Sequence, residues 1–238
     1  MRYLRLDDFP RGHPGMLVHT PYRDLVGPML DIFEEEGVPY ILGVSPLLFQ
    51  EPDVAFLNEH IKLGRACLHG FDHHFGSDQW DYILATWPDG GEFAHMSVEK
   101  LQTRLGVALS LCKDIDRFTQ EHFIPPFNVF NQELLDVLAM DMPQCKWMHT
   151  CDQEWNAYNQ ANLDYHGITP VVSVLSDSYH HVDGVIKNLQ AGEAQGQITL
   201  HWMFDTTRLA STWRTEYRKL AKFLIEEDER IALENGDY

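Results

Sequence analysis

The stretch LRLDDFPRG, Leu4 to Gly12, shapes the interpretation of the whole chain. A short run of strand-forming residues ends on two adjacent aspartates, and a Pro and Gly turn follows. Two like charges at the end of a buried strand repel each other unless a positive charge lies nearby. A divalent cation would relieve this repulsion. The stretch therefore raises the hypothesis that a strand delivers Asp7 and Asp8 to a metal site.

Beyond this stretch, short apolar runs of strand length alternate with longer segments of helical period. This alternation is typical of βα units around a parallel sheet. The predicted strands are 3–6, 39–44, 65–68, 122–124, 146–150, 168–175 and 197–200. The predicted helices are 22–36, 54–62, one capped by Ser97 with an apolar stripe from Leu101 to Phe118, 132–140, 182–190 and 213–234. The pattern predicts an α/β fold, a distorted (β/α) barrel of about seven parallel strands in one domain, 1–238.

Composition limits the classes of partner. The 238 residues suffice for one domain with a sizeable core. The chain has 18 Lys and Arg against 36 Asp and Glu, a formal charge of −18, which repels nucleic acid and anionic membrane surfaces. No leader pattern or membrane-spanning run is visible. The 4 cysteines lack CxxC spacing and the density of a disulfide scaffold, so free thiols and a cytoplasmic location are expected.

Polar residues follow several predicted strands at the point where each strand ends. Asp7 and Asp8 follow the first strand, HGFDHH (His69 to His74) the third, PPFN (Pro125 to Asn128) the fourth, and His201 the last. The carboxyl ends of parallel barrel strands lie on one face, where active sites are built. We therefore expect these residues to meet in one cleft.

Two histidines in this set have the spacing of a metal-ligand pair. His69 and His73 are four residues apart, so a helical turn would point both imidazoles the same way. Two histidines, one carboxylate and open positions form a hydrolytic metal site. Other interpretations remain open, because adjacent aspartates also begin loops or cap helices and His201 can be a satisfied core histidine. The sequence lacks GxGxxG, Walker and GxSxG motifs, which excludes the common dinucleotide, nucleotide and serine-hydrolase sites.

Four segments together resemble a known family. LRLDD, LHGFDHH, FIPPFN and GQITLHW are similar, in order and spacing, to motifs of the polysaccharide deacetylases of carbohydrate esterase family 4. The resemblance implies a distorted (β/α) barrel and one bound divalent metal ion, expected to be zinc. It implies that Asp7 is the catalytic base and His201 the catalytic acid. It also implies that the metal ligands are Asp8, His69 and His73.

The same resemblance gives candidates for substrate binding. Leu200 matches the position that lines the acetyl pocket, and the third motif contributes Pro126 and Asn128. Trp155 and Trp202 are added because flat aromatic faces commonly line carbohydrate clefts.

This chain departs from the family pattern in two motifs. The family's third motif carries an arginine that orients the base, whereas this chain reads HFIPPFN there. The fourth motif, an Asp near a Trp, has its best counterpart in CDQEW, with Asp152 and Trp155. The implied activity is removal of an N-acetyl or O-acetyl group from a small saccharide or polysaccharide precursor. Two alternatives stay open: a metal-dependent amidase for a non-sugar amide or imide, and a catalytically inactive saccharide-binding protein on the same barrel.

Overall fold

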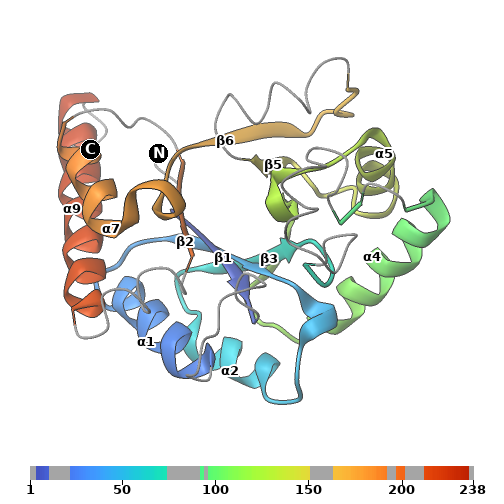
Figure 1. Cartoon of the computed structure of the whole chain (residues 1–238), viewed down its shortest axis with the longest axis horizontal. Helices are drawn as coiled ribbons and strands as arrows, with labels where there is room; N and C mark the ends of the chain where they lie inside the picture. Colours follow the sequence, from blue (N-terminus) through green and yellow to red (C-terminus); the bar gives the residue numbers. More distant parts are fainter. Residues whose placement is uncertain are drawn as a thin grey trace.

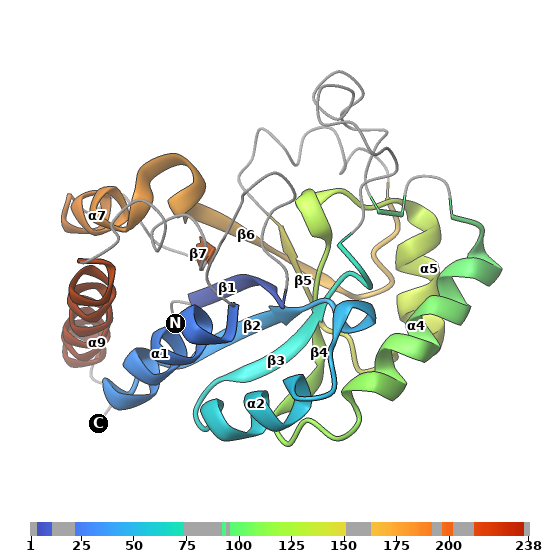
Figure 2. The ribbon, with the colours of Figure 1, turned by 60° about the horizontal axis from the view of Figure 1, so that its bottom comes forward.

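Seven parallel strands form the centre of the molecule (Figures 1 and 2). The computed structural model describes residues 4–10, 22–73, 92–93, 96–150, 163–191, 197–201 and 212–235. The strands follow one another around the sheet in chain order, and β1 pairs with β7 to close a barrel. The strands are β1 Leu4–Phe9, β2 Tyr40–Val44, β3 Arg65–His69, β4 Phe118–Ile124, β5 Trp147–Thr150, β6 Thr169–Ser176 and β7 Gln197–His201. The predicted α/β class and distorted (β/α) barrel are confirmed.

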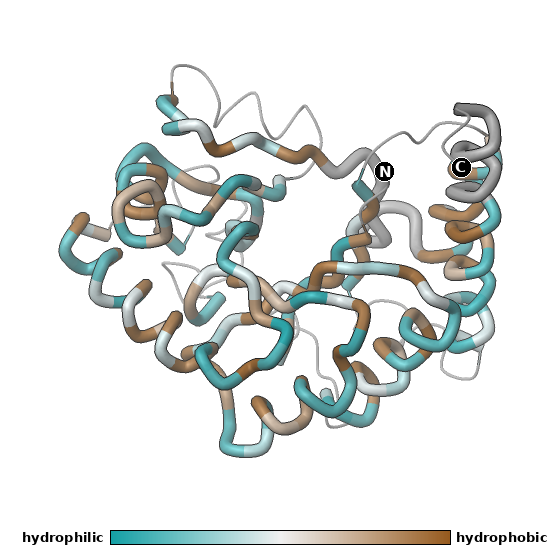
Figure 3. The backbone as a smooth tube through the Cα atoms, turned by 180° about the vertical axis from the view of Figure 1, so that it is seen from behind, coloured by the Kyte–Doolittle hydropathy of each residue, from teal (hydrophilic) through white to brown (hydrophobic). Residues whose placement is uncertain are grey.

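Helices cover the outside of this barrel, with α4 beside α5 on one side and α7 beside α9 on the other (Figure 1). Where Figure 3 colours the helices, apolar and polar residues recur in turn along them, as expected of helices with one face on a core. The helices are α1 Tyr22–Glu35, α2 Asp53–His60, α4 Val98–Cys112, α5 Gln132–Asp141, α7 Asp177–Gln190 and α9 Trp213–Asn235, with 3-10 turns η1 Pro46–Leu48 and η2 Pro126–Asn128. None of the helices in the described ranges combines the length and the apolar character needed to cross a membrane.

Two helices begin at side-chain caps. The Ser97 hydroxyl accepts a hydrogen bond from the backbone N–H of Lys100, and Asn131 accepts one from Leu134. Each cap satisfies an N–H that has no partner inside the helix. The cap predicted at Ser97 is confirmed.

The strands separate two packed regions. Side chains alternate along a strand, so Leu4 and Leu6 of β1 join the core between strands and helices, while Arg5 and Asp7 lie on the other face of the strand. A small separate apolar cluster consists of Ile41, Cys67 and Ile124 on β2, β3 and β4. The remaining buried side chains on this second face are largely polar, which concentrates charge inside the barrel.

Three local predictions were wrong. His69 and His73 are not joined by a helical turn, because β3 ends at His69 and the chain turns through Gly70 with a φ of 62°. Phe118 begins β4 instead of continuing the helix that ends at Cys112, since its apolar spacing merely extends the helical period across a turn. The helix predicted over 182–190 begins earlier, at Asp177, because α7 follows β6 directly, so His180 and His181 lie inside it.

The cysteine prediction is confirmed where the structure describes it. Cys67, Cys112 and Cys145 are buried free thiols. Burial raises the pKa of Cys67 well above its ordinary value. Cys151 lies outside the described residues.

Candidate metal centre and active site

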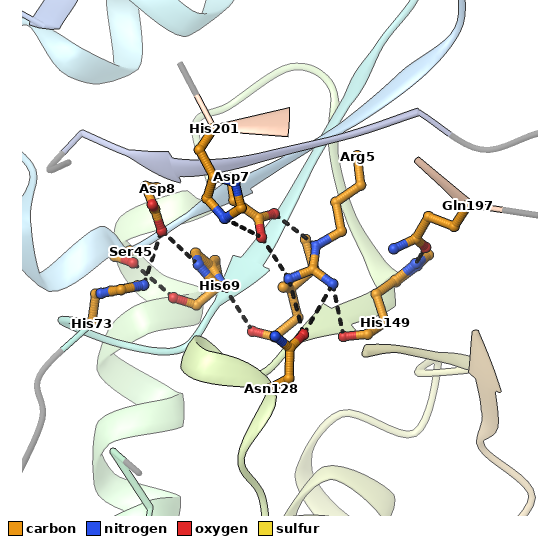
Figure 4. Close-up of polar contacts among 11 residues, drawn as sticks. Arg5, Asp7, Asp8, Ser45, His69, His73, Asn128, His149, Gln197 and His201 are labelled. Carbon is orange, nitrogen blue, oxygen red and sulfur yellow. Dashed lines mark hydrogen bonds and ion pairs between the residues drawn. The ribbon is translucent and has the colours of Figure 1, made fainter. Parts of the chain in front are cut away.

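A bulge in β1 explains how two consecutive aspartates reach the same site. Neighbouring strand residues normally point to opposite faces. Between Leu6 and Phe9 the pairing of β1 with β2 shifts by one residue, and Asp8 has a φ of 73°. A β-bulge re-aims a side chain in this way. Asp8 therefore turns toward the side of the strand where Asp7 already lies (Figure 4).

Asp8, His69 and His73 form a buried cluster whose ligand atoms lie within 4.8 Å of one another. Oδ1 of Asp8 is 3.0 Å from Nε2 of His69 and 2.9 Å from Nε2 of His73 (Figure 4). These are the three residues that the resemblance assigned to the metal. A turn with positive φ at Gly70 and His73, and not a helix, brings the two imidazoles together.

The hydrogen bonds of His69 test whether the cluster fits a metal ion. Its Nδ1 lies 3.2 Å from the carbonyl oxygen of Ile124, while its Nε2 faces the Asp8 carboxylate. A neutral ring carries one proton, so one of these nitrogens must face an oxygen with its lone pair. Only a second ring proton or a metal ion satisfies both. Since burial lowers the pKa of His69, the metal ion is the better fit.

The charges of the cluster support each other. Burial by itself would raise the pKa of Asp8, but the neighbouring His73 and the hydrogen bonds from both histidines hold it well below its ordinary value. Burial would lower the pKa of His73, yet the Asp8 charge outweighs it and raises the pKa. The site thus keeps one ionised carboxylate beside two imidazoles, the donor set of a divalent transition metal.

Asp7 lies next to the cluster and is held by Arg5. Nε of Arg5 donates to Oδ1 of Asp7 at 2.8 Å, and NH2 donates to Oδ2 at 2.5 Å. The two residues are two positions apart on β1, so strand alternation puts both on the same face. Both are almost completely buried. A bidentate arginine of this kind fixes both the position and the orientation of a carboxylate.

The ion pair also controls the charge of Asp7. Burial alone would raise the pKa of Asp7, but the charge of Arg5 and its hydrogen bonds, together with His69 and His201, lower it. The segment HFIPPFN at the end of β4 carries no arginine, and in this structure it is an arginine of β1 that holds Asp7. The signal in the sequence is the spacing Arg-x-Asp on a strand, which sequence analysis missed.

His201 completes the group. It is the last residue of β7 and pairs directly with Asp7 across the sheet. Its Nε2 lies 3.8 Å from Oδ2 of Asp7, and its side chain is 17% exposed, whereas Asp7 is 1% exposed. A partly exposed imidazole next to a buried carboxylate and a metal-ligand cluster has access both to the site and to solvent.

Known proteins share the fold of this chain at low sequence identity. No protein-family model and no curated protein matches the sequence. The Xyl-CE4 domain of a multidomain xylanase from the hindgut metagenome of Trinervitermes trinervoides superposes with a TM-score of 0.57 at 14% identity, covering 96% of this chain and 82% of that one. The fold is that of the family 4 carbohydrate esterases.

Two further solved structures share this fold. A mutant of a peptidoglycan deacetylase from Bacillus subtilis has a TM-score of 0.54 at 12% identity, covering 99% of this chain and 95% of that one. A family 4 pseudoenzyme from Bacillus anthracis has a TM-score of 0.54 at 11% identity, covering 92% and 61%. A mutant of that pseudoenzyme has restored enzymatic activity. The family 4 fold alone therefore does not decide catalysis, and the side chains of the site must.

The predicted substrate-binding residues have mixed placements. Asn128 has a φ of 59°, and its Oδ1 lies 3.4 Å from NH1 of Arg5, so it supports the arginine. Leu200 is fully buried in the core between strands and helices, on the opposite face of β7 from His201. Its role in an acetyl pocket stays a prediction that this placement does not favour. Trp155 and Trp202 lie outside the described residues, as does Asp152.

Three histidines without a predicted partner have one in the structure. Nδ1 of His60 lies 2.7 Å from Asp31, and Nε2 of His166 lies 2.7 Å from Asp136. Nε2 of His149 lies 2.8 Å from Nδ1 of His122 inside the barrel. None of these three belongs to the metal cluster. Their partners come from distant segments, which periodicity does not reveal.

Proposed function

We propose that this chain is a metal-dependent deacetylase, which hydrolyses an N-acetyl or O-acetyl group on a saccharide. One observation carries the proposal: a metal-ligand cluster, an arginine-bound carboxylate and a partly exposed histidine share one end of the barrel. Asp8, His69 and His73 would hold the metal, with zinc as the expected ion. The fold of carbohydrate esterases supports a saccharide as substrate.

The residues divide the chemistry among them. A divalent metal at this site supplies Lewis acidity toward the acyl oxygen and makes water more acidic. Asp7 takes the proton from the attacking water, because Arg5 keeps its carboxylate ionised and oriented. Protonated His201 gives a proton to the departing amine or alcohol. The bond between the acyl carbon and that nitrogen or oxygen breaks, and acetate is released.

The test is hydrolysis of a panel of substrates by the zinc-loaded protein. Acetate is measured for N-acetylglucosamine oligomers and acetylated xylose, formate for formamide, and the ring-opened acid for a cyclic imide. We expect acetate from a saccharide, and a fall of about 100- to 10,000-fold in kcat for Asp7→Asn with zinc content unchanged.

Three results would contradict the proposal. Hydrolysis confined to formamide or the imide would indicate the amidase. Saccharide binding without acetate release would indicate an inactive binding protein, the alternative that the pseudoenzyme neighbour makes concrete. Full activity of Asp7→Asn would remove Asp7 from the role of base.

A further inference from the structure

The backbone between the two metal-ligating histidines is held by a residue outside the proposed catalytic set. Oε1 of Glu92 accepts hydrogen bonds from the backbone N–H of Phe71 at 2.9 Å and of Asp72 at 3.2 Å. These two residues lie between His69 and His73. The Glu92 side chain is fully buried. A buried carboxyl group thus bridges two consecutive peptide groups of the ligand loop, Gly70–Asp72.

The fit around Gly70 shows how closely the loop is enclosed. A Cβ at this position would lie 2.2 Å from Oε2 of Glu92 and 2.4 Å from Cγ of Pro126. Gly70 also has a φ of 62°, which glycine adopts without a steric penalty. The ligand loop is therefore packed closely against both Glu92 and the turn after β4.

The other polar groups of the loop are tied to neighbouring strands. The Ser45 hydroxyl donates to the carbonyl of His69 at 2.7 Å, and the N–H of Leu47 donates to the carbonyl of Phe71 at 2.9 Å. The N–H of Gly70 donates to the carbonyl of Ile124 at 3.1 Å. These hydrogen bonds hold the carbonyl groups of His69 and Phe71 and the N–H of Gly70. Glu92 holds the two N–H groups that remain before His73.

An arginine completes this support. Arg104 of α4 forms an ion pair with Asp72, and its NH2 lies 3.9 Å from Oε1 of Glu92. Its guanidinium also lies over the ring of Phe71, 5.7 Å from the centroid. Within the described residues Oε2 of Glu92 accepts no hydrogen bond, so the contact with the loop rests on Oε1.

We propose that Glu92 is a positioning residue of the metal site, which sets the distance between His69 and His73 by binding the backbone between them. The inference rests on the proposed function, because it assumes that the cluster binds a metal. Residues that orient metal ligands from outside typically change metal affinity by about 10- to 100-fold when removed. Glu92→Ala should therefore weaken zinc binding by that factor, while Glu92→Gln, which keeps an oxygen acceptor, should remain within about threefold of the wild type.

The experiment measures zinc affinity of the metal-stripped, full-length protein by competition with a chromophoric chelator. Circular dichroism and thermal unfolding report the folded fraction of each variant. Asp53→Ala is the matched control. Asp53 is also a buried carboxylate that accepts a backbone N–H, from Gln50 at 2.7 Å, and pairs with an arginine, Arg23. Its loss should lower the unfolding temperature and leave zinc affinity unchanged.

The outcomes separate the two proposals. Weaker zinc binding in Glu92→Ala, recovered in Glu92→Gln and absent in Asp53→Ala, supports the positioning role. Equal zinc affinity of folded Glu92→Ala and wild type overturns it and leaves the deacetylase proposal intact. An equal loss in Asp53→Ala also overturns it, because the effect would then be general destabilisation. A wild type that binds no zinc overturns both.

Discussion

Among the residues that the structure describes, two pairs of buried histidines differ in the residue that each pair faces. His69 and His73 at one end face the carboxylate of Asp8. His122 and His149 lie on β4 and β5, with His149 facing the side-chain oxygen of Gln197 on β7 (Figure 4). Arg5 lies between the two pairs, since it binds Asp7 and also donates to the carbonyl of His149 at 3.3 Å.

The two pairs differ in how many ring protons are needed to satisfy their hydrogen bonds. In the pair on β4 and β5, Nδ1–H of His122 can donate to Nε2 of His149, and Nδ1–H of His149 to Gln197, with one proton on each ring. Both rings are then neutral and satisfied. Burial lowers the pKa of His122 to about 4 and of His149 to about 3, which keeps them neutral. The pair facing Asp8 needs a cation, so a carboxylate partner distinguishes the candidate metal site from a structural network.

The strongest test makes the same substitution in each pair. His69→Gln should reduce zinc affinity by at least about 100-fold, because it removes one of three protein ligands. His149→Gln should bind zinc like the wild type and lose stability on the order of 1–3 kcal/mol, since Gln197 and His122 lose a buried partner. Zinc content by plasma mass spectrometry and urea unfolding measure the two effects. Loss of zinc from His149→Gln would show that the pairs are not independent.

A smaller effect is expected at the residue between the pairs. Lysine cannot reproduce the bidentate contact of Arg5, so Arg5→Lys should lower kcat/KM by about 10- to 100-fold with zinc content unchanged. Because the hydrogen bonds of Arg5 lower the pKa of Asp7, the variant should move the acid limb of the pH profile to higher pH. A fall in activity with an unchanged pH profile would mean that Arg5 acts on folding alone.

The smallest effect concerns pH and stability. In the unfolded chain His149 takes up a proton below about pH 6.5, whereas in the folded protein it stays neutral down to a pKa of about 3. The unfolded state therefore binds more protons in this window, and stability is lost as pH falls from about 6.5. His149 contributes up to about 1.4 kcal/mol per pH unit. In His149→Gln the free energy of unfolding, measured with urea, should depend less steeply on pH between about 6.5 and about 4 than in the wild type. Equal slopes for the two proteins would contradict the neutral network.

Much of the fold could be predicted from the sequence, because the strand and helix periods are locally encoded. The strand ends at Asp7, His69 and His201 also predicted which side chains would meet, since parallel barrel strands share one carboxyl end. Contacts between distant segments could not be predicted in this way. Glu92 reaches the ligand loop from 20 positions away, and Gln197 faces His149 across the barrel, through geometry that no local pattern contains.

Arg5 and Asp7 stand on one strand, two residues apart, so the bidentate contact that holds Asp7 does not depend on an arginine from another segment. In the turn after β4, an engineer could exchange residues that contact neither Arg5 nor Gly70, while Asp7 kept its orientation from its own strand. A search that requires an arginine after β4 would pass over chains built in this way. A pattern that accepts Arg-x-Asp-Asp in the first strand would find them.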